Sequence, residues 1–333
     1  MKNIVEKLLE NQNLTQEESR EVMFKIMSGE FDDAQIAGFL IALRAKGENY
    51  EEIAGFAQAM RDKMTPIETV DDAIDMCGTG GDALGTFNIS TAASFVVAGA
   101  GVPVAKHGNR SMTSKSGSAD VLTALGVDIT MPPDKVSECI QNIGIGFMFA
   151  PSLHPAMKYA MGARKALGIR TVFNILGPLC NPAGVNRQLI GIFDGNLTDK
   201  IAKVLQRLGS THAMVVHGNE GLDEISTTDD TNYTELKPDG EIHSGTFSHS
   251  DYGFSTTDLE SLKGGEPDEN ARIIRYIFDG ETGPRRDIVV INAGAGIMVG
   301  GKAKSLADGI KLAEEVIVSG SAKNVLESLA AVQ

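Results

Sequence analysis

The chain has 333 residues, 42% of them hydrophobic, and a formal net charge of −14 at pH 7. This length and apolar content suit a globular protein of one large or two moderate domains. The acidic balance argues against a nucleic-acid partner, because phosphate neutralisation needs a basic face, and no apolar run approaches the roughly 20 residues of a membrane helix.

Two local features predict a cytoplasmic protein. The first residues, MKNIVEKLLENQN, carry Glu6 and Glu10 where a signal peptide would be apolar, so we expect no export. The three cysteines are widely spaced, at Cys77, Cys139 and Cys180. That spacing fits neither a disulfide framework nor a metal knuckle, and it is compatible with a reducing compartment.

The first 65 residues are predicted to form helices only. Thr15 and Glu18 have the spacing of a capping box, and Pro66 stops the helical region. Such short helices bury little surface alone, so we expect them to pack on later helices or on another subunit. We assign residues 1–68 to a small all-α domain.

From residue 73 the hydrophobic period changes. Short apolar runs predict strands at 102–105, 145–149, 188–193 and 212–216. They alternate with amphipathic segments of helical length at 90–99, 118–125, 133–142 and 197–208. This alternation is typical of the α/β class, with a central, mostly parallel sheet flanked by helices. The large α/β domain is assigned to 69–153 and 181–333, and helices of about 154–180 are expected to join the small domain.

Two later segments complete the expected elements. Residues 231–243 have strand patterns on both sides of Pro-Asp-Gly, which predicts an antiparallel hairpin. Residues 285–332 predict two or three helices. The sequence contains no convincing internal repeat.

The first candidate site is the stretch CGTGGDALGTFNIST, residues 77–91, between a strand and a helix. Ligands in open α/β sheets bind at the carboxyl ends of strands, and loop N–H groups before a helix attract anions. The spacing matches neither the dinucleotide motif nor the P-loop. Asp82 suits a ribose hydroxyl or a metal-bound water better than a bare phosphate. The alternative is a sharp turn without a ligand, in which Ser90 or Thr91 only caps the helix.

The second candidate is AKHGNRSMTSKSGSAD, residues 105–120, which repeats the order strand, loop and helix. It gathers four basic side chains with a single acid, Asp120, at its far end: Lys106, His107, Arg110 and Lys115. A solvated surface loop is the alternative. Two donor-rich loops at neighbouring strand ends favour one ligand with two anionic groups.

The third candidate is the acidic pair Asp223 and Glu224 in GLDEIS, after the strand at 212–216. Adjacent carboxylates can bind Mg²⁺, which prefers oxygen ligands, although most such pairs are surface charges. His154 at a helix start is typical of a packing or capping residue. Arg164 is typical of an exposed arginine unless the ligand offers a carboxylate.

Five segments, taken in order and spacing, resemble the anthranilate phosphoribosyltransferase family. They are GTGGD at 78–82, NIST at 88–91, KHGNR at 106–110, SGSAD at 116–120 and the acidic pair at 223–224. The resemblance extends over essentially the whole chain. Two alternatives stay open: a pyrimidine nucleoside phosphorylase of the same fold, whose KHSTGG-type motif the chain lacks, and a non-catalytic relative that binds nucleic acid.

The resemblance implies an enzyme of tryptophan biosynthesis with a small α domain and a large α/β domain. It implies transfer of the phosphoribosyl group of phosphoribosyl pyrophosphate, the donor, to the amine of anthranilate, with pyrophosphate released. It also implies Mg²⁺, two ions per subunit, and a homodimer formed through the helical domain. No residue acts as a general base, so catalysis would rest on positioning and on the metal.

The resemblance also implies roles for residues at the matched positions. Donor contacts would come from Gly78, Gly81, Asp82, Thr86, Asn88, Ile89, Ser90, Thr91, Lys106, His107, Gly108, Asn109, Arg110, Ser111, Met112, Thr113, Ser114 and Ser118. Anthranilate would contact Gly78, His107, Asn109, His154, Arg164 and Pro178. Magnesium would be held by Ser90, Asp223 and Glu224.

Overall fold

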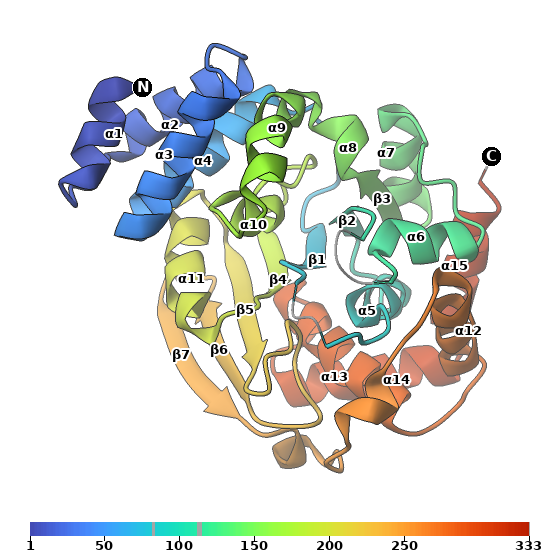
Figure 1. The fold of residues 1–333 in the computed structure, drawn as a ribbon. Coiled ribbons are helices and arrows are strands. Elements are labelled where there is room, and N and C mark those ends of the chain that lie inside the picture. The colour runs from blue at the N-terminus through green and yellow to red at the C-terminus, as the bar shows by residue number, and fades with distance from the viewer. Residues whose placement is uncertain (82–83, 112–114, 333) are drawn as a thin grey trace.

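The N-terminal region is helical, as predicted. The computed structural model of the protein describes residues 1–81, 84–111 and 115–332 (Figure 1). Its first helices are α1 (Lys2–Leu9), α2 (Gln16–Met27), α3 (Asp33–Lys46) and α4 (Tyr50–Lys63). Capping boxes begin α2, α3 and α4, so the first turn of each has partners for its N–H groups.

One mixed sheet forms the centre of the molecule. Its strands are β1 (Ile74–Gly78), β2 (Val104–Gly108), β3 (Ile145–Phe149), β4 (Arg187–Gly191), β5 (His212–Gly218), β6 (Thr231–Leu236) and β7 (Ile242–Phe247). Their order is β3-β2-β1-β4-β5-β6-β7. The first five strands are parallel, and β6 and β7 form the predicted antiparallel hairpin. Strand order reverses between β1 and β4, which is where open α/β sheets bind ligands.

Helices cover both faces of the sheet, which confirms the predicted α/β class. They are α5 (Ile89–Gly99), α6 (Ser118–Ala124), α7 (Pro133–Asn142), α11 (Thr198–Arg207), α12 (Pro267–Phe278), α13 (Pro284–Val299), α14 (Leu306–Val318) and α15 (Ser321–Ala330). Alternate strand residues pack on opposite faces: Leu189 joins the core beneath α5 and α13, whereas Ile190 joins the core shared with α11 and the N-terminal helices. The sequence did not indicate α12.

The segment 154–176 packs on the N-terminal helices and is not one continuous helix. It contains α9 (Lys158–Leu167) and α10 (Phe173–Leu176), and α8 (Ala150–Leu153) precedes it. Gly168, with φ of +62°, ends α9 in the left-handed conformation, and residues 168–172 form a non-helical connection. Ala163 N donates to Asp33 Oδ1 (3.1 Å) and so ties α9 to α3. In Figure 1, α9 and α10 lie between the blue helices and the sheet.

Short 3₁₀ turns complete the structure: η1 (Pro155–Met157), η2 (Gly177–Leu179), η3 (Gly195–Leu197), η4 (His249–Tyr252) and η5 (Leu259–Leu262). Within the described part of the chain, no helix combines the length and the apolar character needed to cross a bilayer.

Candidate active site

Glycines end the strands at the carboxyl edge of the sheet, because the loop with the acidic pair packs directly on them. A Cβ on Gly78, the last residue of β1, would lie 2.5 Å from Asp223 Oδ2. A Cβ on Gly191, the last residue of β4, would lie 1.6 Å from the Asp223 carbonyl oxygen. Real side chains do not make such contacts, so only glycine lets Asp223 reach the point where strand order reverses.

The acidic pair is hydrogen-bonded to the first glycine loop. Asp223 Oδ2 accepts from Gly80 N (2.7 Å), and Glu224 Oε1 accepts from Ser90 N at the start of α5 (3.0 Å). The following residue, Ile225, is buried and exchanges two backbone hydrogen bonds with the side chain of Asn292 on α13. The third candidate therefore lies against the first, although 143 residues separate Gly80 from Asp223 in the chain.

The oxygen ligands available at this point fit Mg²⁺. Asp223 and Glu224 offer carboxylate oxygens, and Ser90 offers a hydroxyl, all of which are hard ligands. Backbone N–H groups orient one oxygen of each carboxylate, and Gly78 leaves the space that Asp223 occupies. The described residues contain no group of three or more His, Cys, Asp or Glu side chains that could hold a metal ion by themselves. Mg²⁺ usually binds through one or two carboxylates and keeps water or phosphate ligands, which agrees with this small set.

The first loop is held to the rest of the protein on several sides. Gly80 and Gly81 have φ of +65° and +80°, which a residue with a side chain rarely adopts. Thr79 N donates to the Gly191 carbonyl (2.9 Å), and Thr86 pairs with Lys263 in an isolated bridge. Asp82, assigned above to the donor, lies outside the described residues.

Asn88 links the two glycine-rich loops. Its Nδ2 donates to the Ser116 carbonyl (3.1 Å), and its Oδ1 accepts from Ser116 Oγ (3.1 Å) and from Asn270 Nδ2 (2.9 Å). Two other predicted contacts with phosphoribosyl pyrophosphate, Ile89 and Thr91, lie on α5 and are buried. Of these three residues, Asn88 is placed where its side chain shapes the loops.

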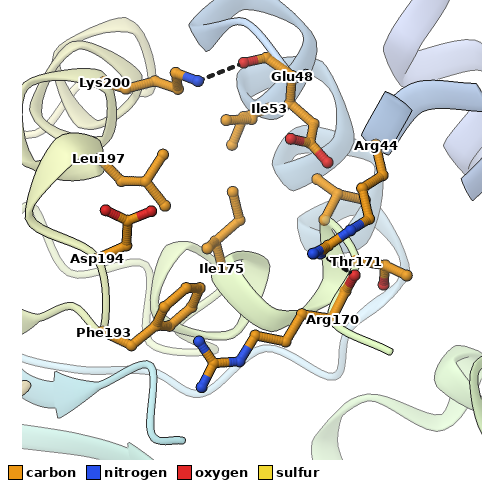
Figure 2. Close-up of a pocket in the computed structure, with 11 residues that line it drawn as sticks. Arg44, Glu48, Ile53, Arg170, Thr171, Ile175, Phe193, Asp194, Leu197 and Lys200 are labelled. Carbon is orange, nitrogen blue, oxygen red and sulfur yellow. Dashed lines mark hydrogen bonds between the residues drawn. The ribbon is translucent and has the colours of Figure 1, made fainter. Parts of the chain in front are cut away.

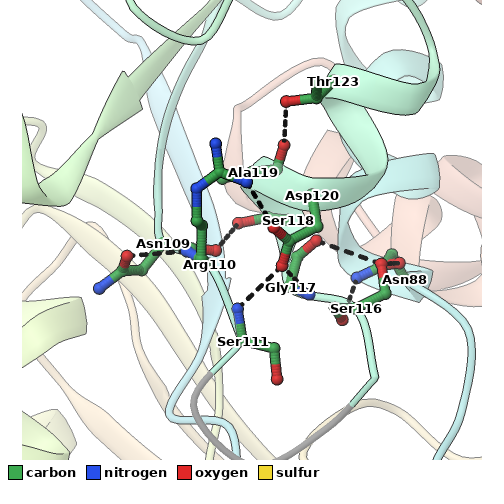
Figure 3. Close-up of polar contacts among 10 residues, drawn as sticks. All are labelled: Asn88, Asn109, Arg110, Ser111, Ser116, Gly117, Ser118, Ala119, Asp120 and Thr123. Carbon is green, nitrogen blue, oxygen red and sulfur yellow. Dashed lines mark hydrogen bonds and ion pairs between the residues drawn. The ribbon is translucent and has the colours of Figure 1, made fainter. Parts of the chain in front are cut away.

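The second loop folds around Asp120, near the start of α6 (Figure 3). Asp120 Oδ2 accepts from Ser111 N (3.0 Å) and Gly117 N (2.9 Å), and Oδ1 accepts from Arg110 Nη1 (2.8 Å). Asn109 accepts from Ser118 Oγ (3.3 Å) through its carbonyl, and a Cβ on Gly108 would lie 2.2 Å from that hydroxyl. Met112, Thr113 and Ser114, three predicted donor contacts, lie outside the described residues.

Lys106 is buried beneath this loop. Its Nζ donates to the Met76 carbonyl on β1 (2.5 Å). Burial lowers the pKa of Lys106 and raises the pKa of the buried Asp75 carboxyl on β1, while the attraction between the two opposes both shifts. Asp75 Oδ1 also accepts from His107 N (3.1 Å), so it fixes the backbone of β2 next to the loop.

The predicted acceptor residues are placed in two groups. His107 and His154 lie together, with ring centroids 5.0 Å apart. Burial lowers their pKa values to about 3 and about 4, so both imidazoles are neutral at pH 7. Each Nε2 is buried and has no hydrogen-bond partner among the described residues. Arg164, on α9, lies over the Phe173 ring (5.1 Å), and Pro178 is buried in η2.

A cavity of about 490 Å³ lies beside this site, between the N-terminal helices and the sheet (Figure 2). Its lining comes from α3, α4 and the turn between them, the connection after α9, α10, the segment after β4, and α11. The residues are Arg44, Glu48, Ile53, Arg170, Thr171, Val172, Ile175, Phe193, Asp194, Leu197 and Lys200. None of them is a site residue predicted from the sequence.

Sequence reasoning missed residues that shape the loops without belonging to either motif. Arg170 Nη2 donates to the Gly81 carbonyl, and Asn270 reaches Asn88 across 182 residues of chain. Neither residue lies in a distinctive local pattern. Asp120 had a signal, since an acid three residues after Gly117 at a helix start has capping-box spacing.

Comparisons with known proteins agree over nearly the whole chain. The family model described as "Glycosyl transferase family, a/b domain" matches residues 70–323, and the one described as "Glycosyl transferase family, helical bundle domain" matches residues 2–64. An anthranilate phosphoribosyltransferase of Acetivibrio thermocellus is 52% identical over 328 residues, which cover 98% of this chain and 95% of that protein. One of Methanocorpusculum labreanum is 52% identical over 327 residues, with coverage of 98% and 96%.

Solved structures give the same result. The anthranilate phosphoribosyltransferase of Thermus thermophilus superposes with a TM-score of 0.92 at 42% identity, covering 98% of each chain. That of Saccharomyces cerevisiae, in complex with phosphoribosyl pyrophosphate and Mg, has a TM-score of 0.89 at 29% identity, covering 99% of this chain and 98% of its own.

Proposed function

The chain belongs to the anthranilate phosphoribosyltransferase family, and we infer that it transfers the phosphoribosyl group of phosphoribosyl pyrophosphate to the amine of anthranilate. The products are N-(5-phosphoribosyl)anthranilate and pyrophosphate, in tryptophan biosynthesis. The observation that carries this inference is the meeting of the glycine loop and the acidic pair through Gly80–Asp223 and Ser90–Glu224. Asn88 joins the basic loop to the same place.

The two loops suit a donor with anionic groups at both ends. Backbone N–H groups at Gly78 and Gly81 and around the start of α5 would bind one group, and the loop from Gly108 to Ser118 would bind the other. Lys106 would add positive charge from beneath. Because the loops are already linked through Asn88, they would bind the donor with little reordering.

Ser90, Asp223 and Glu224 would hold Mg²⁺, and we propose two ions per subunit. The yeast relative was solved with phosphoribosyl pyrophosphate and Mg. When bound, Mg²⁺ would supply charge stabilisation for the departing pyrophosphate. The residues of the chain would keep the two carboxylates aligned through Gly80 N and Ser90 N.

The acceptor needs positioning more than activation. An arylamine is neutral at pH 7, so its nitrogen can attack the anomeric carbon while the bond from that carbon to pyrophosphate breaks, and the amine then loses a proton. Arg164 and Asn109 would orient the anthranilate carboxylate and ring. His107, His154 and Pro178 would line its path, and the neutral imidazoles would not add charge there.

We also propose a cytoplasmic homodimer formed through the helical domain. Apolar side chains on α2, α3 and α9 are exposed, namely Phe24 (39%), Ile41 (42%) and Met161 (43%). Residues 1–68 with about 154–180 would form that domain, and 69–153 with 181–333 the α/β domain. The helices that expose these side chains also pack on one another, since α9 contacts α2 and α3.

The test is to identify the product. Purified protein is incubated with phosphoribosyl pyrophosphate, anthranilate and Mg²⁺, and the products are separated and weighed by mass spectrometry. We expect phosphoribosylanthranilate and pyrophosphate in equal amounts. A parallel reaction with uridine or thymidine and phosphate tests the nucleoside phosphorylase alternative, which the names of the relatives do not support. Base release there, with no phosphoribosylanthranilate formed, would reverse the assignment.

A further inference from the structure

We propose that Arg170 is a positioning residue for the donor loop and that it ties this loop to the helical domain. The inference rests on the proposed function, because its readout is binding of the phosphoribosyl donor. Arg170 lies in the connection 168–172 between α9 and α10 and belongs to neither glycine-rich motif. It touches the loop and not the expected reacting atoms.

The guanidinium of Arg170 holds the first loop through its backbone. Arg170 Nη2 donates to the carbonyl oxygen of Gly81. On the other side, Asp223 Oδ2 accepts from the N–H of Gly80. The two peptides with left-handed glycines are therefore held between a cation and a carboxylate. Glycine in this conformation has the largest backbone freedom to lose, so contacts from both sides decide which conformation the loop keeps.

Phe193 supports Arg170 from below. The guanidinium carbon lies 4.1 Å from the centroid of the Phe193 ring, and Figure 2 shows the two side chains next to each other. The N–H of Phe193 donates to Thr79 Oγ1 (3.1 Å), so the same residue also fixes the start of the loop. Three successive residues of the loop are therefore hydrogen-bonded to three different segments. Thr79 bonds to Phe193, Gly80 to Asp223 and Gly81 to Arg170.

Arg44 connects this arrangement to the N-terminal helices. Arg44 lies in the last turn of α3, and its Nη1 donates to the backbone carbonyl of Arg170. A chain of contacts thus runs from α3 through Arg170 to Gly81. Any movement of α3 relative to the sheet would act on the loop through this chain.

The remaining side of Arg170 faces the cavity of about 490 Å³ (Figure 2). Its side chain is therefore not fixed by close packing in a core. Its position depends on Gly81, Phe193 and Arg44. For a residue held by so few groups, removing one of them should change the loop more than the global stability.

The first experiment compares Arg170→Met with Lys165→Met. Both changes remove one positive charge, but Lys165 lies on α9 and makes no hydrogen bond or ion pair with the described residues of the loop. We expect Arg170→Met to raise the KM for phosphoribosyl pyrophosphate about tenfold, the effect of one hydrogen bond to a charged group, with kcat nearly unchanged. Arg170→Lys keeps a charged group that can donate a hydrogen bond, so this variant should retain most of the affinity for phosphoribosyl pyrophosphate. Lys165→Met should behave as the wild type.

The second experiment tests the connection to α3. Arg44→Met should raise the donor KM by a smaller factor, because it loosens Arg170 without removing it. In the double variant with Arg170→Met, the Arg44 change should add nothing, since its effect passes through the lost guanidinium. If the two changes multiplied instead, the proposed connection would be wrong.

Donor affinity measured by calorimetry with Mg²⁺ and no anthranilate separates this inference from the proposed function. A wild type that binds the donor but forms no product would overturn the acceptor assignment and leave the calorimetric test of Arg170 intact. A productive wild type whose Arg170→Met variant keeps the normal donor KM would overturn this inference alone. If Arg170→Met does not fold, Arg44→Met carries the test, and a normal donor KM in that variant would overturn the inference.

Discussion

At the residue scale, the site depends on two glycines, whose lack of a Cβ leaves room for Asp223. Asp223 reaches the end of β1 only because Gly78 has no Cβ. Gly191, at the end of β4, likewise leaves room for the backbone carbonyl of Asp223. The first and third candidate clusters therefore meet through close contact at the strand ends, and side-chain bulk at these two positions would separate them.

Gly78→Ala should move the acidic pair. The added methyl group would lie 2.5 Å from Asp223 Oδ2, so the carboxylate must leave its hydrogen bond with Gly80. We expect the Mg²⁺ concentration for half-maximal rate to rise about tenfold, as for loss of a charge-assisted hydrogen bond. Gly38→Ala on α3, where a Cβ meets nothing within 4 Å, is the matched control and should leave it unchanged. An unchanged Mg²⁺ response in Gly78→Ala would contradict this geometry.

The buried histidines should make stability depend on pH. The pKa values of His107 and His154 are lowered to about 3 and about 4 in the folded state, against an ordinary value of about 6.5. Between these values the unfolded chain binds more protons, so this contribution is complete above pH ~6.5 and is lost as the pH falls towards 4. The free energy of unfolding in urea should be lower at pH 5 than at pH 7.5, by an amount on the order of 1–3 kcal/mol from these two groups.

His154→Gln should weaken this dependence. The exposed His243, changed to Gln, serves as the control and should keep the full difference between the two pH values. If His154→Gln and the wild type lost equal stability on acidification, burial of this imidazole would not be the cause.

At the element scale, each loop is fixed by the start of the helix that follows it. The N–H groups at the start of α5 meet Glu224, and the turn before α6 wraps around Asp120. Asn270 of α12 then joins both loops through Asn88. A donor that spans the two loops would therefore bind to two helix N-termini held at a fixed separation.

Asp120→Asn should weaken donor binding while the fold persists. The change removes the negative charge that accepts from Ser111 N, Gly117 N and Arg110, and such caps contribute about 1 kcal/mol. We expect the donor KM to rise several-fold, with a small drop in Tm. Asp308→Asn removes a carboxylate in the first turn of α14 that accepts from Ser305 Oγ (2.7 Å), away from both loops, and should leave the donor KM unchanged. Equal donor KM values in the two variants would contradict a role for Asp120 in shaping the loop.

Much of this element-scale picture followed from sequence. Strand ends, glycine loops and helix starts have local signals, and the hydrophobic period changes near residue 73, just before β1 begins at Ile74. The connection 168–172 did not follow from the sequence, because α9 ends at a glycine inside an otherwise helical pattern. Contacts such as Arg170 with Gly81, which are 89 residues apart, leave no local trace in a single sequence. Roles assigned to individual site residues stay predictions.

At the scale of the whole molecule, the N-terminal helices and one face of the sheet share an apolar core. The same buried cluster contains Phe39 of α3, Ala163 of α9 and Ile201 of α11. This sharing explains why short helices that could not be stable alone pack here. It leaves the outer faces of α2, α3 and α9 with exposed apolar side chains, which is where we place the second subunit.

Ile41→Asp should therefore produce a monomer. A buried, unpaired carboxylate at a subunit interface opposes association strongly. Val318→Asp on α14, at a residue that is 81% exposed, introduces the same charge elsewhere and should leave the oligomer intact. Size-exclusion chromatography with light scattering distinguishes the two masses. A wild type that runs as a monomer of 35.3 kDa would refute the proposed dimer.

The most direct test of the central claim is the loss of anthranilate fluorescence on addition of phosphoribosyl pyrophosphate, followed as Mg²⁺ is titrated. The wild type and an Asp223→Asn, Glu224→Gln variant are compared. We expect fluorescence loss in the wild type only with both substrates and Mg²⁺, and a rate lower by about 100-fold or more in the variant. A variant with the wild-type rate and Mg²⁺ response would show that the acidic pair does not serve the metal, and the account of the site would fail.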